Sequence, residues 1–181
     1  MKVKTLFSVV CVSLGLLGCV TPTVGLGLSD NAGRMGIGDA RLGDQRGSVL
    51  TAASAEFGTA PKCETKKVLV KNSRRAYALE TCTFSDIQAE LADIKVNNLD
   101  YYFIDDLLQR IDLLADGDSV DMEVIKSHLD KRFGRIATVS DSDQGLYLWQ
   151  NSQDQAQLQP ITDSAQFQLK VIDTNAAVKA F

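Results

Sequence analysis

The chain has 181 residues and a formal net charge of −4 at pH 7, with a single histidine and 23% charged residues. This acidic balance argues against nucleic acid and anionic lipid surfaces as partners. The length is sufficient for one domain with a hydrophobic core of its own.

The first residues predict an export signal. Two lysines precede residues 5–18, an uncharged stretch rich in Leu, Val and Phe. This stretch is too short for a membrane-spanning helix, which needs roughly 20 apolar residues. It leads into Leu16-Leu17-Gly18-Cys19, a string that resembles the lipobox of bacterial lipoproteins. The resemblance implies cleavage before Cys19 and lipid on its thiol; an ordinary secretory signal and a short buried helix are the alternatives.

The residue after the cysteine predicts the membrane. Lipoproteins of this kind are retained in the inner membrane when Asp follows the cysteine, so Val20 implies the outer membrane, with the domain facing the periplasm. In a host with a single membrane, the protein is expected on its outer face. Several acyl chains anchor a protein firmly, since each buried CH₂ contributes about 0.8 kcal/mol. The first predicted partner is therefore the membrane, through lipid on Cys19.

Residues 19–47 are expected to form a flexible tether. Glycine recurs through them with few large apolar residues between, a composition typical of linkers. A single α+β domain is then expected at residues 48–181. Gly25-Leu26-Gly27 does not predict a nucleotide-binding loop, because no strand followed by a helix surrounds it.

A short helix is predicted where the tether ends. Ser48 can serve as its N-cap, and Gly58 can end it. Val49, Ala53 and Phe57 would form its apolar face.

A hairpin joined by a disulfide is predicted next. Its strands are Lys66–Asn72 and Ala76–Phe84, around a polar turn. With Asn72-Ser73 as the turn residues, Cys63 falls opposite Cys82. An oxidising periplasm favours a bond between the two thiols. A longer turn, two free thiols and a metal pair are the alternatives, although no His or Cys cluster completes a zinc site.

The rest of the chain predicts one long helix among strands. The helix is expected at Val120–Phe133, capped by Asp118 or Ser119. Its apolar residues recur at helical spacing: Met122, Ile125, Leu129 and Phe133. The strand segments are Ile94–Val96, Leu99–Ile104, Leu107–Leu114, Leu146–Trp149, Ala156–Ile161 and Ala165–Val171, with Asp105-Asp106 near a turn. The last segment alternates apolar residues with Gln166, Gln168 and Lys170, the pattern of a half-buried strand.

The two helices predict a repeated unit. The spacing of Val49, Ala53 and Phe57-Gly58 matches that of Ile125, Leu129 and Phe133-Gly134, and strands follow each helix. The expected fold class is α+β, with an antiparallel sheet of about six strands, two helices packed on one face and one disulfide.

This arrangement resembles the SmpA/OmlA-type envelope lipoproteins and the related β-lactamase-inhibitor-protein architecture. The resemblance rests on the tethered lipobox, on the helix ending in Phe133-Gly134 and on the tryptophan-bearing strand Leu146–Trp149. It covers residues 119–173. It implies a non-catalytic partner in outer-membrane assembly or envelope integrity.

No residue pattern predicts catalysis, a cofactor or a metal. His128 falls at the edge of the apolar stripe of its helix, as a surface or boundary histidine does. The acidic cluster, defined as Asp105, Asp106, Asp112, Asp116, Asp118, Asp121 and Glu123, lacks the spacing of a calcium loop. A charged turn and a helix N-terminus explain these residues, and a glycosidase-like carboxylate pair is the alternative.

The first hairpin is strongly basic. Lys71, Arg74 and Arg75 lie at its turn and are the candidate residues for binding a partner. They would suit lipopolysaccharide phosphates, peptidoglycan carboxylates or an acidic protein. The alternative is a solvated edge that charge protects against strand pairing.

The leading functional hypothesis is an outer-membrane-anchored lipoprotein that binds an envelope protein through its sheet or hairpin, without catalysis. Nucleic acid is not an expected partner. The first alternative is an inhibitor or sequestering protein of an envelope-active hydrolase. The second is a ligand-binding, Ca²⁺-binding or enzymatic domain that uses the acidic cluster.

Overall fold

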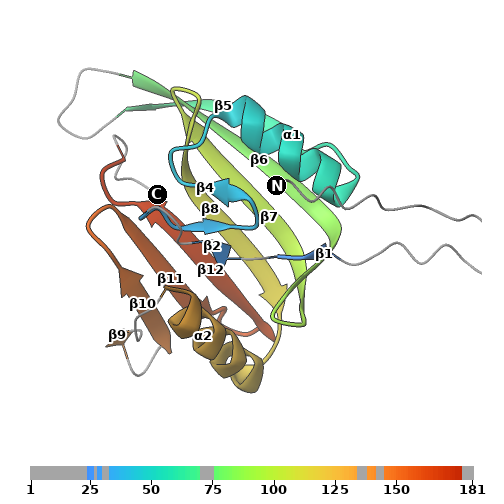
Figure 1. Ribbon diagram of the computed structural model, residues 1–181, viewed down its shortest axis with the longest axis vertical. Helices are drawn as coiled ribbons and strands as arrows, with labels where there is room; N and C mark the ends of the chain where they lie inside the picture. Colours follow the sequence, from blue (N-terminus) through green and yellow to red (C-terminus); the bar gives the residue numbers. More distant parts are fainter. Residues whose placement is uncertain are drawn as a thin grey trace, which may run out of the picture.

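The computed structural model describes residues 24–26, 28–29, 33–69, 76–133, 138–141 and 145–176. These residues form two helices, a large sheet and a small sheet (Figure 1). The helices are α1 (Arg46–Phe57) and α2 (Ser119–Phe133). The strands are β1 (Val24–Gly25), β2 (Leu28–Ser29), β3 (Gly36–Ile37), β4 (Ala40–Arg41), β5 (Lys62–Leu69), β6 (Ala76–Leu91), β7 (Ile94–Ile104), β8 (Leu107–Asp116), β9 (Thr138–Asp141), β10 (Leu146–Gln150), β11 (Asp154–Pro160) and β12 (Gln166–Asp173).

Two meanders meet in the middle of the large sheet. Its strand order is β1-β6-β7-β8-β12-β11-β10-β9, and β5 also pairs with β6. Four antiparallel strands, β5–β8, follow α1, and four more, β9–β12, follow α2. The final strands of the two sets, β8 and β12, pair with each other. The apolar residues have the same spacing in the two helices because each helix begins a unit of one helix and four strands, and this unit is present twice.

The α+β class with two helices and one disulfide is confirmed, but the predicted strand number is wrong. The large sheet has nine strands in the described part of the chain, rather than about six. Strand β9 is mostly polar and therefore has no apolar pattern that predicts it. Strand β1 comes from the segment that was expected to be a tether. Because β1 runs parallel to β6, the sheet is also not purely antiparallel.

One face of the large sheet carries the hydrophobic core. Successive side chains of a strand point to opposite faces, and Phe167, Leu169 and Val171 of β12 are buried while their neighbours are not. Buried residues of α1, β3 and α2 belong to the same hydrophobic cluster. Figure 1 shows both helices and the small sheet β2-β3-β4 on this side. The helices therefore pack on one face, as predicted.

The C-terminus of α1 and the N-terminus of α2 follow the signals in the sequence, but the predicted N-cap of α1 is wrong: Gln45 takes that position in place of Ser48, and no side chain caps the helix. α1 begins two residues before Ser48 and ends at Gly58, whose φ of +66° is the left-handed conformation that glycine adopts readily. At the start of α2, Asp118 Oδ1 accepts a hydrogen bond from the Asp121 amide, and Asp121 Oδ2 accepts one from the Asp118 amide. This reciprocal cap satisfies two amides at the end of the helix. The apolar stripe predicted for α2 is buried along its whole length.

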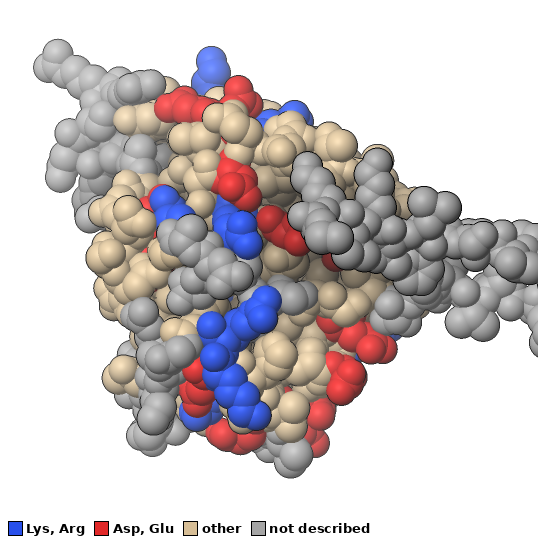
Figure 2. Space-filling model, viewed as in Figure 1, with Lys and Arg blue, Asp and Glu red and all other residues tan. Residues whose placement is uncertain are grey.

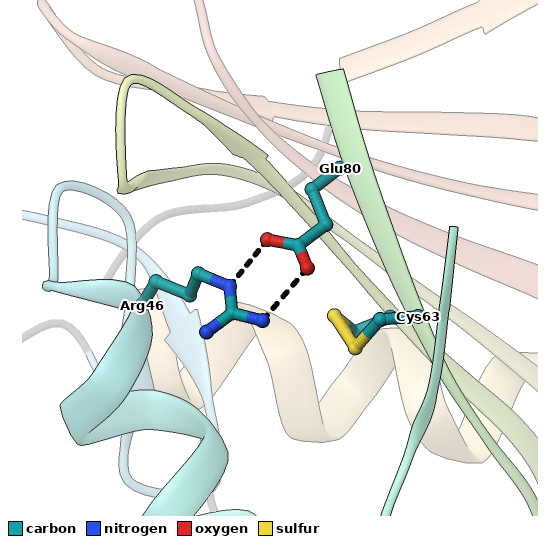
Figure 3. The surroundings of a disulfide bond; sticks show 4 residues. Arg46, Cys63 and Glu80 are labelled. Carbon is teal, nitrogen blue, oxygen red and sulfur yellow. Dashed lines mark hydrogen bonds and ion pairs between the residues drawn. A yellow bond between two sulfur atoms is a disulfide. The ribbon is translucent and has the colours of Figure 1, made fainter. Parts of the chain in front are cut away.

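The β5–β6 hairpin has the predicted register. Cys63 pairs with Cys82 across the strands, and their sulfur atoms are bonded at 2.08 Å. Figure 3 shows Arg46, at the start of α1, next to this disulfide and hydrogen-bonded to Glu80 of β6. The hairpin is thus tied to α1 as well as crosslinked. Its turn lies outside the described residues.

Part of the expected tether belongs to the folded body. Residues 33–45 place three buried side chains, Met35, Ile37 and Leu42, in the core. Arg34 forms ion pairs with Asp154 and Asp173, at 3.1 and 2.7 Å. The folded unit therefore begins before residue 48, and glycines in this segment serve its turns rather than flexibility.

Loss of the disulfide is expected to destabilise the protein. The double variant Cys63→Ser, Cys82→Ser should lose about 3 kcal/mol of unfolding free energy, because the crosslink spans a sequence separation of 19 residues. Urea unfolding measures the difference. A reductant should bring the wild type to the level of the variant and leave the variant unchanged. Equal stabilities under oxidising conditions would contradict this prediction.

A second stability measurement tests whether residues 33–45 belong to the core or to a flexible tether. Ile37→Ala is expected to cost about 3 kcal/mol of unfolding free energy, because Ile37 is 1% exposed and its truncation leaves a cavity. A freely mobile linker would show no effect. Val124→Ala is the control, since Val124 is 48% exposed on α2. Both values come from the same urea titration.

Candidate functional site

Of the residues predicted for lipidation, disulfide formation and partner binding, only the disulfide cysteines lie in the described part of the chain. Their bond is confirmed. Cys19, Lys71, Arg74 and Arg75 lie outside the described residues. Lipidation and the basic hairpin turn therefore stay predictions.

The acidic cluster does not converge on one point. Asp105 and Asp106 form the β7–β8 turn, Asp118 and Asp121 cap α2, and Asp112 lies within β8. Within the described ranges, the only three possible metal ligands that lie close together are the disulfide cysteines and Glu80, and the two sulfurs are bonded to each other. A charged turn accounts for Asp105 and Asp106, and a helix N-terminus accounts for Asp118 and Asp121. Neither accounts for Asp112, which lies within a strand.

His128 lies on the surface. It is exposed on α2, beside Val124 and Ala92, along an open groove between this helix and the β6–β7 turn. This placement agrees with a surface or boundary histidine.

The strongest candidate site is the face of the large sheet opposite the core, here called the open face. Its side chains alternate with the buried ones, and neither described helix lies on that side (Figure 1). The register aligns these side chains in rows across the strands. One row joins β6, β7, β8, β12 and β11 through Thr83, Asp100, Asp112, Lys170 and Gln157.

A rigid charged group occupies the middle of the open face. Arg110 donates to both carboxylate oxygens of Asp112, and the two side chains are only 11% and 5% exposed. The guanidinium carbon also lies 4.8 Å from the centre of the Tyr102 ring. Gln168 donates a further hydrogen bond of 3.3 Å to Asp112. Paired contacts of this kind hold a guanidinium in one orientation.

Tyr102 keeps its proton in this setting. Burial, followed by the charges of Asp112 and Asp100, raises the pKa of Tyr102 to about 12. Its hydroxyl therefore remains neutral under physiological conditions. A neutral phenol can both donate and accept hydrogen bonds.

Glutamines border the charged group on the side of β11 and β12. Their side chains are half-buried, and the set comprises Gln155, Gln157, Gln159, Gln166 and Gln168. Gln157 donates to Gln155 at 3.3 Å, and Gln166 donates to Asp116 at 3.1 Å. Each amide can donate and accept, so the border suits a partner that presents both kinds of group.

Asp100 is the one carboxylate of this face whose hydrogen bonding is incomplete in the described residues. Its Oδ1 atom is buried without a hydrogen-bond partner. Burial raises the pKa of Asp100, and Asp112 raises it further, while a hydrogen bond from Thr83 opposes both. An unpartnered buried polar atom reduces stability. The fold therefore tolerates Asp100 rather than benefiting from its charge.

No family model, curated protein or solved structure matches the chain. The resemblances noted in the sequence thus stay predictions, and the functional argument rests on the geometry of the open face. Neither described helix is long and apolar enough to cross a membrane.

Removing the charge of Asp100 is expected to stabilise the protein at neutral pH. The folded-state pKa of Asp100 lies above its ordinary value of 3.8, so the folded chain holds this proton more tightly than the unfolded chain. Wild-type stability must then fall as pH rises through the window above 3.8, and Asp100→Asn, which does not titrate there, escapes this loss. The difference in unfolding free energy between the variant and wild type should vanish near pH 3, where Asp100 is protonated in both states, and should grow toward about pH 7.

Urea unfolding of Asp100→Asn at several pH values measures this trend. Asp163→Asn is the control, since Asp163 is exposed in the β11–β12 turn. A variant less stable than wild type at neutral pH would contradict the prediction.

Proposed function

We propose that the protein is a non-catalytic protein-interaction module of the cell envelope, held to the outer membrane by lipid on Cys19, and that it binds a partner protein through the open face. The observation that carries this proposal is the fixed group of Tyr102, Arg110 and Asp112 at the centre of a polar sheet surface. Tyr and Arg are the residue types that dominate binding energy at protein interfaces, and they do so near the interface centre.

The side chains at the centre of the open face are already held in place, and this favours tight binding of a partner. Side chains that must be immobilised on binding each reduce affinity by about 0.5–1.5 kcal/mol. Arg110 is already held by Asp112 and stacked on Tyr102, and Gln168 is already hydrogen-bonded. These groups lose little freedom when a partner docks.

The chemistry of the face favours a protein over a strongly charged ligand. Along the central rows, Arg110 and Lys170 balance Asp100 and Asp112. The bordering glutamines match peptide groups and polar side chains, which also donate and accept. A lysine or arginine of the partner could donate the hydrogen bond that Asp100 Oδ1 lacks. The expected partner is therefore a protein with a polar surface and a basic residue in its contact region.

Blocking the open face is expected to abolish capture of the partner. The double variant Gln155→Arg, Gln157→Arg places two long cations on the face without touching the central group. The matched control, Thr51→Arg with Ala55→Arg, adds the same charge at two exposed positions of α1. Each full-length chain carries a C-terminal tag and is captured from detergent-solubilised envelopes of its own host, with quantitative mass spectrometry of the bound proteins.

The proposal requires a protein that wild type and the α1 control retain and the open-face variant loses by about tenfold or more, which corresponds to 1.4 kcal/mol. Retention by the open-face variant would overturn it. Loss on Arg74→Glu with Arg75→Glu alone would reassign binding to the hairpin turn. The absence of any specific partner would count against an interaction function altogether.

A further inference from the structure

The open face has strands of equal direction on either side of β8. Strands β7 and β12 each pair antiparallel with β8. A twofold axis laid along β8, between two facing copies of the sheet, would therefore place β7 of one copy over β12 of the other. A twofold interface brings one surface patch against itself. The residues of β7 and β12 thus decide whether the open face can bind its own copy.

Charge is complementary across this axis. Asp100 of β7 and Lys170 of β12 lie in one row, on either side of Asp112. The axis brings Asp100 of each copy opposite Lys170 of the other, which gives two ion pairs. In the described chain neither residue forms an ion pair of its own. A second copy would therefore supply the opposite charge that each of them lacks.

The neighbouring rows are complementary as well. The register sets Tyr102 of β7 level with Ile172 of β12, and Asn98 level with Gln168. Across the axis an aromatic ring would thus meet an aliphatic side chain, and an amide would meet an amide. One strand further out, hydroxyls of β6 would meet amides of β11, with Thr81 and Thr83 opposite Gln155 and Gln157. None of these pairs brings like charges together.

The charged centre of the open face does not oppose this pairing. Arg110 and Asp112 lie on the axis and would face their own copies. They neutralise each other within one chain, and their side chains are only 11% and 5% exposed. The half-buried side chains of β7 and β12 on this face are more exposed than this pair. Those flanking side chains would therefore make the contacts.

The extent of the open face suits a dimer. Five strands, from β6 to β11 in the sheet order, lie side by side. At about 4.8 Å between strands and about 3.3 Å per residue, about eight residues of each strand cover roughly 600 Å². Two copies would bury about 1,200 Å² in total, which reaches the range of specific, stable interfaces. The other side of the sheet, seen in Figure 2, is covered by the helices and the small sheet.

We propose that the open face binds the open face of a second copy of this chain, forming a twofold dimer whose sheets stack face to face. Stacked sheets align within about 30° of each other, so the pairs close to the axis stay opposite. This inference rests on the proposed function, in which the open face is the binding surface, and it names the partner. Lys170 of the second copy is the basic residue expected in the partner's contact region.

Charge reversal tests the dimer. Two full-length chains with different C-terminal tags are expressed together, solubilised in detergent and captured through one tag, and the second tag is quantified. Wild type should retain wild type. Asp100→Lys paired with itself opposes two lysines, and Lys170→Asp paired with itself opposes two aspartates, so each should lose the second tag by about tenfold or more. Asp100→Lys paired with Lys170→Asp should recover it.

This recovery is specific to the proposed arrangement. The mixed pair is complementary, and both unmixed pairs are repulsive, only if the positions of Asp100 and Lys170 face each other across the two copies. Two chains that merely share a micelle would be retained equally in all pairs. Asp163→Lys, a reversal of the same kind in the exposed β11–β12 turn, is the control and should retain its own copy.

A second set of variants keeps the test independent of Asp100. One chain carries Thr81→Lys with Gln155→Lys, and the other carries Thr81→Glu with Gln155→Glu. These positions face each other across the axis, so each chain should fail to retain its own copy, while the mixed pair should form. Folding of every variant is checked by urea unfolding, and this set decides the outcome if Asp100→Lys does not fold.

Three results would overturn the inference: wild type that does not retain its own copy, equal retention in all pairs, and loss in the unmixed pairs without recovery in the mixed pair. If a different envelope protein is then captured by wild type and lost by the Gln155→Arg, Gln157→Arg variant, the proposed function stands with another partner. If neither a second copy nor another protein is retained, the inference and the proposed function fail together.

Discussion

The pairing of β8 with β12 is the constraint on which the rest of the structure depends. It joins the two meanders, each following its own helix, into one sheet. It also sets the faces: Leu113 and Leu169 lie together on the core side, and Asp112 and Lys170 lie together on the other. A slip of one residue would exchange these faces. The register of this single pair of strands therefore determines both the core and the polar surface.

Strand β7 separates the core from the open face. Asp100 and Tyr101 are consecutive, so their side chains point to opposite faces. Tyr101 packs against Phe84 and Phe103 on the core side, whereas an oxygen of Asp100 is buried on the open face without a hydrogen-bond partner in the described chain. Folding alone does not favour such an atom. Its presence is consistent with a surface shaped by binding.

Local patterns in the sequence predicted what depends on neighbours along the chain. The stripe of α2, the glycine that ends α1 and the register of the first hairpin all follow from spacing, and the disulfide followed from that register. The segment 33–45 was missed because Met35, Ile37 and Leu42 stand apart among glycines, and Arg34 is fixed by Asp154, 120 positions away. The open face was missed for a similar reason. Alternation identifies a half-buried strand, but only the strand order places Asp100 beside Asp112.

The short strand β1 begins close to Cys19 in the sequence. Val24 pairs with Ala89 at the edge of the sheet, and Leu26 donates a hydrogen bond to the Glu90 carbonyl at 2.7 Å. Val24 is only five positions after Cys19 in the sequence, and five steps of about 3.5 Å span at most roughly 18 Å. If Cys19 carries lipid, the pairing of β1 with β6 holds the domain close to the lipid headgroups. Partners would then have to approach it within a thin layer above the bilayer.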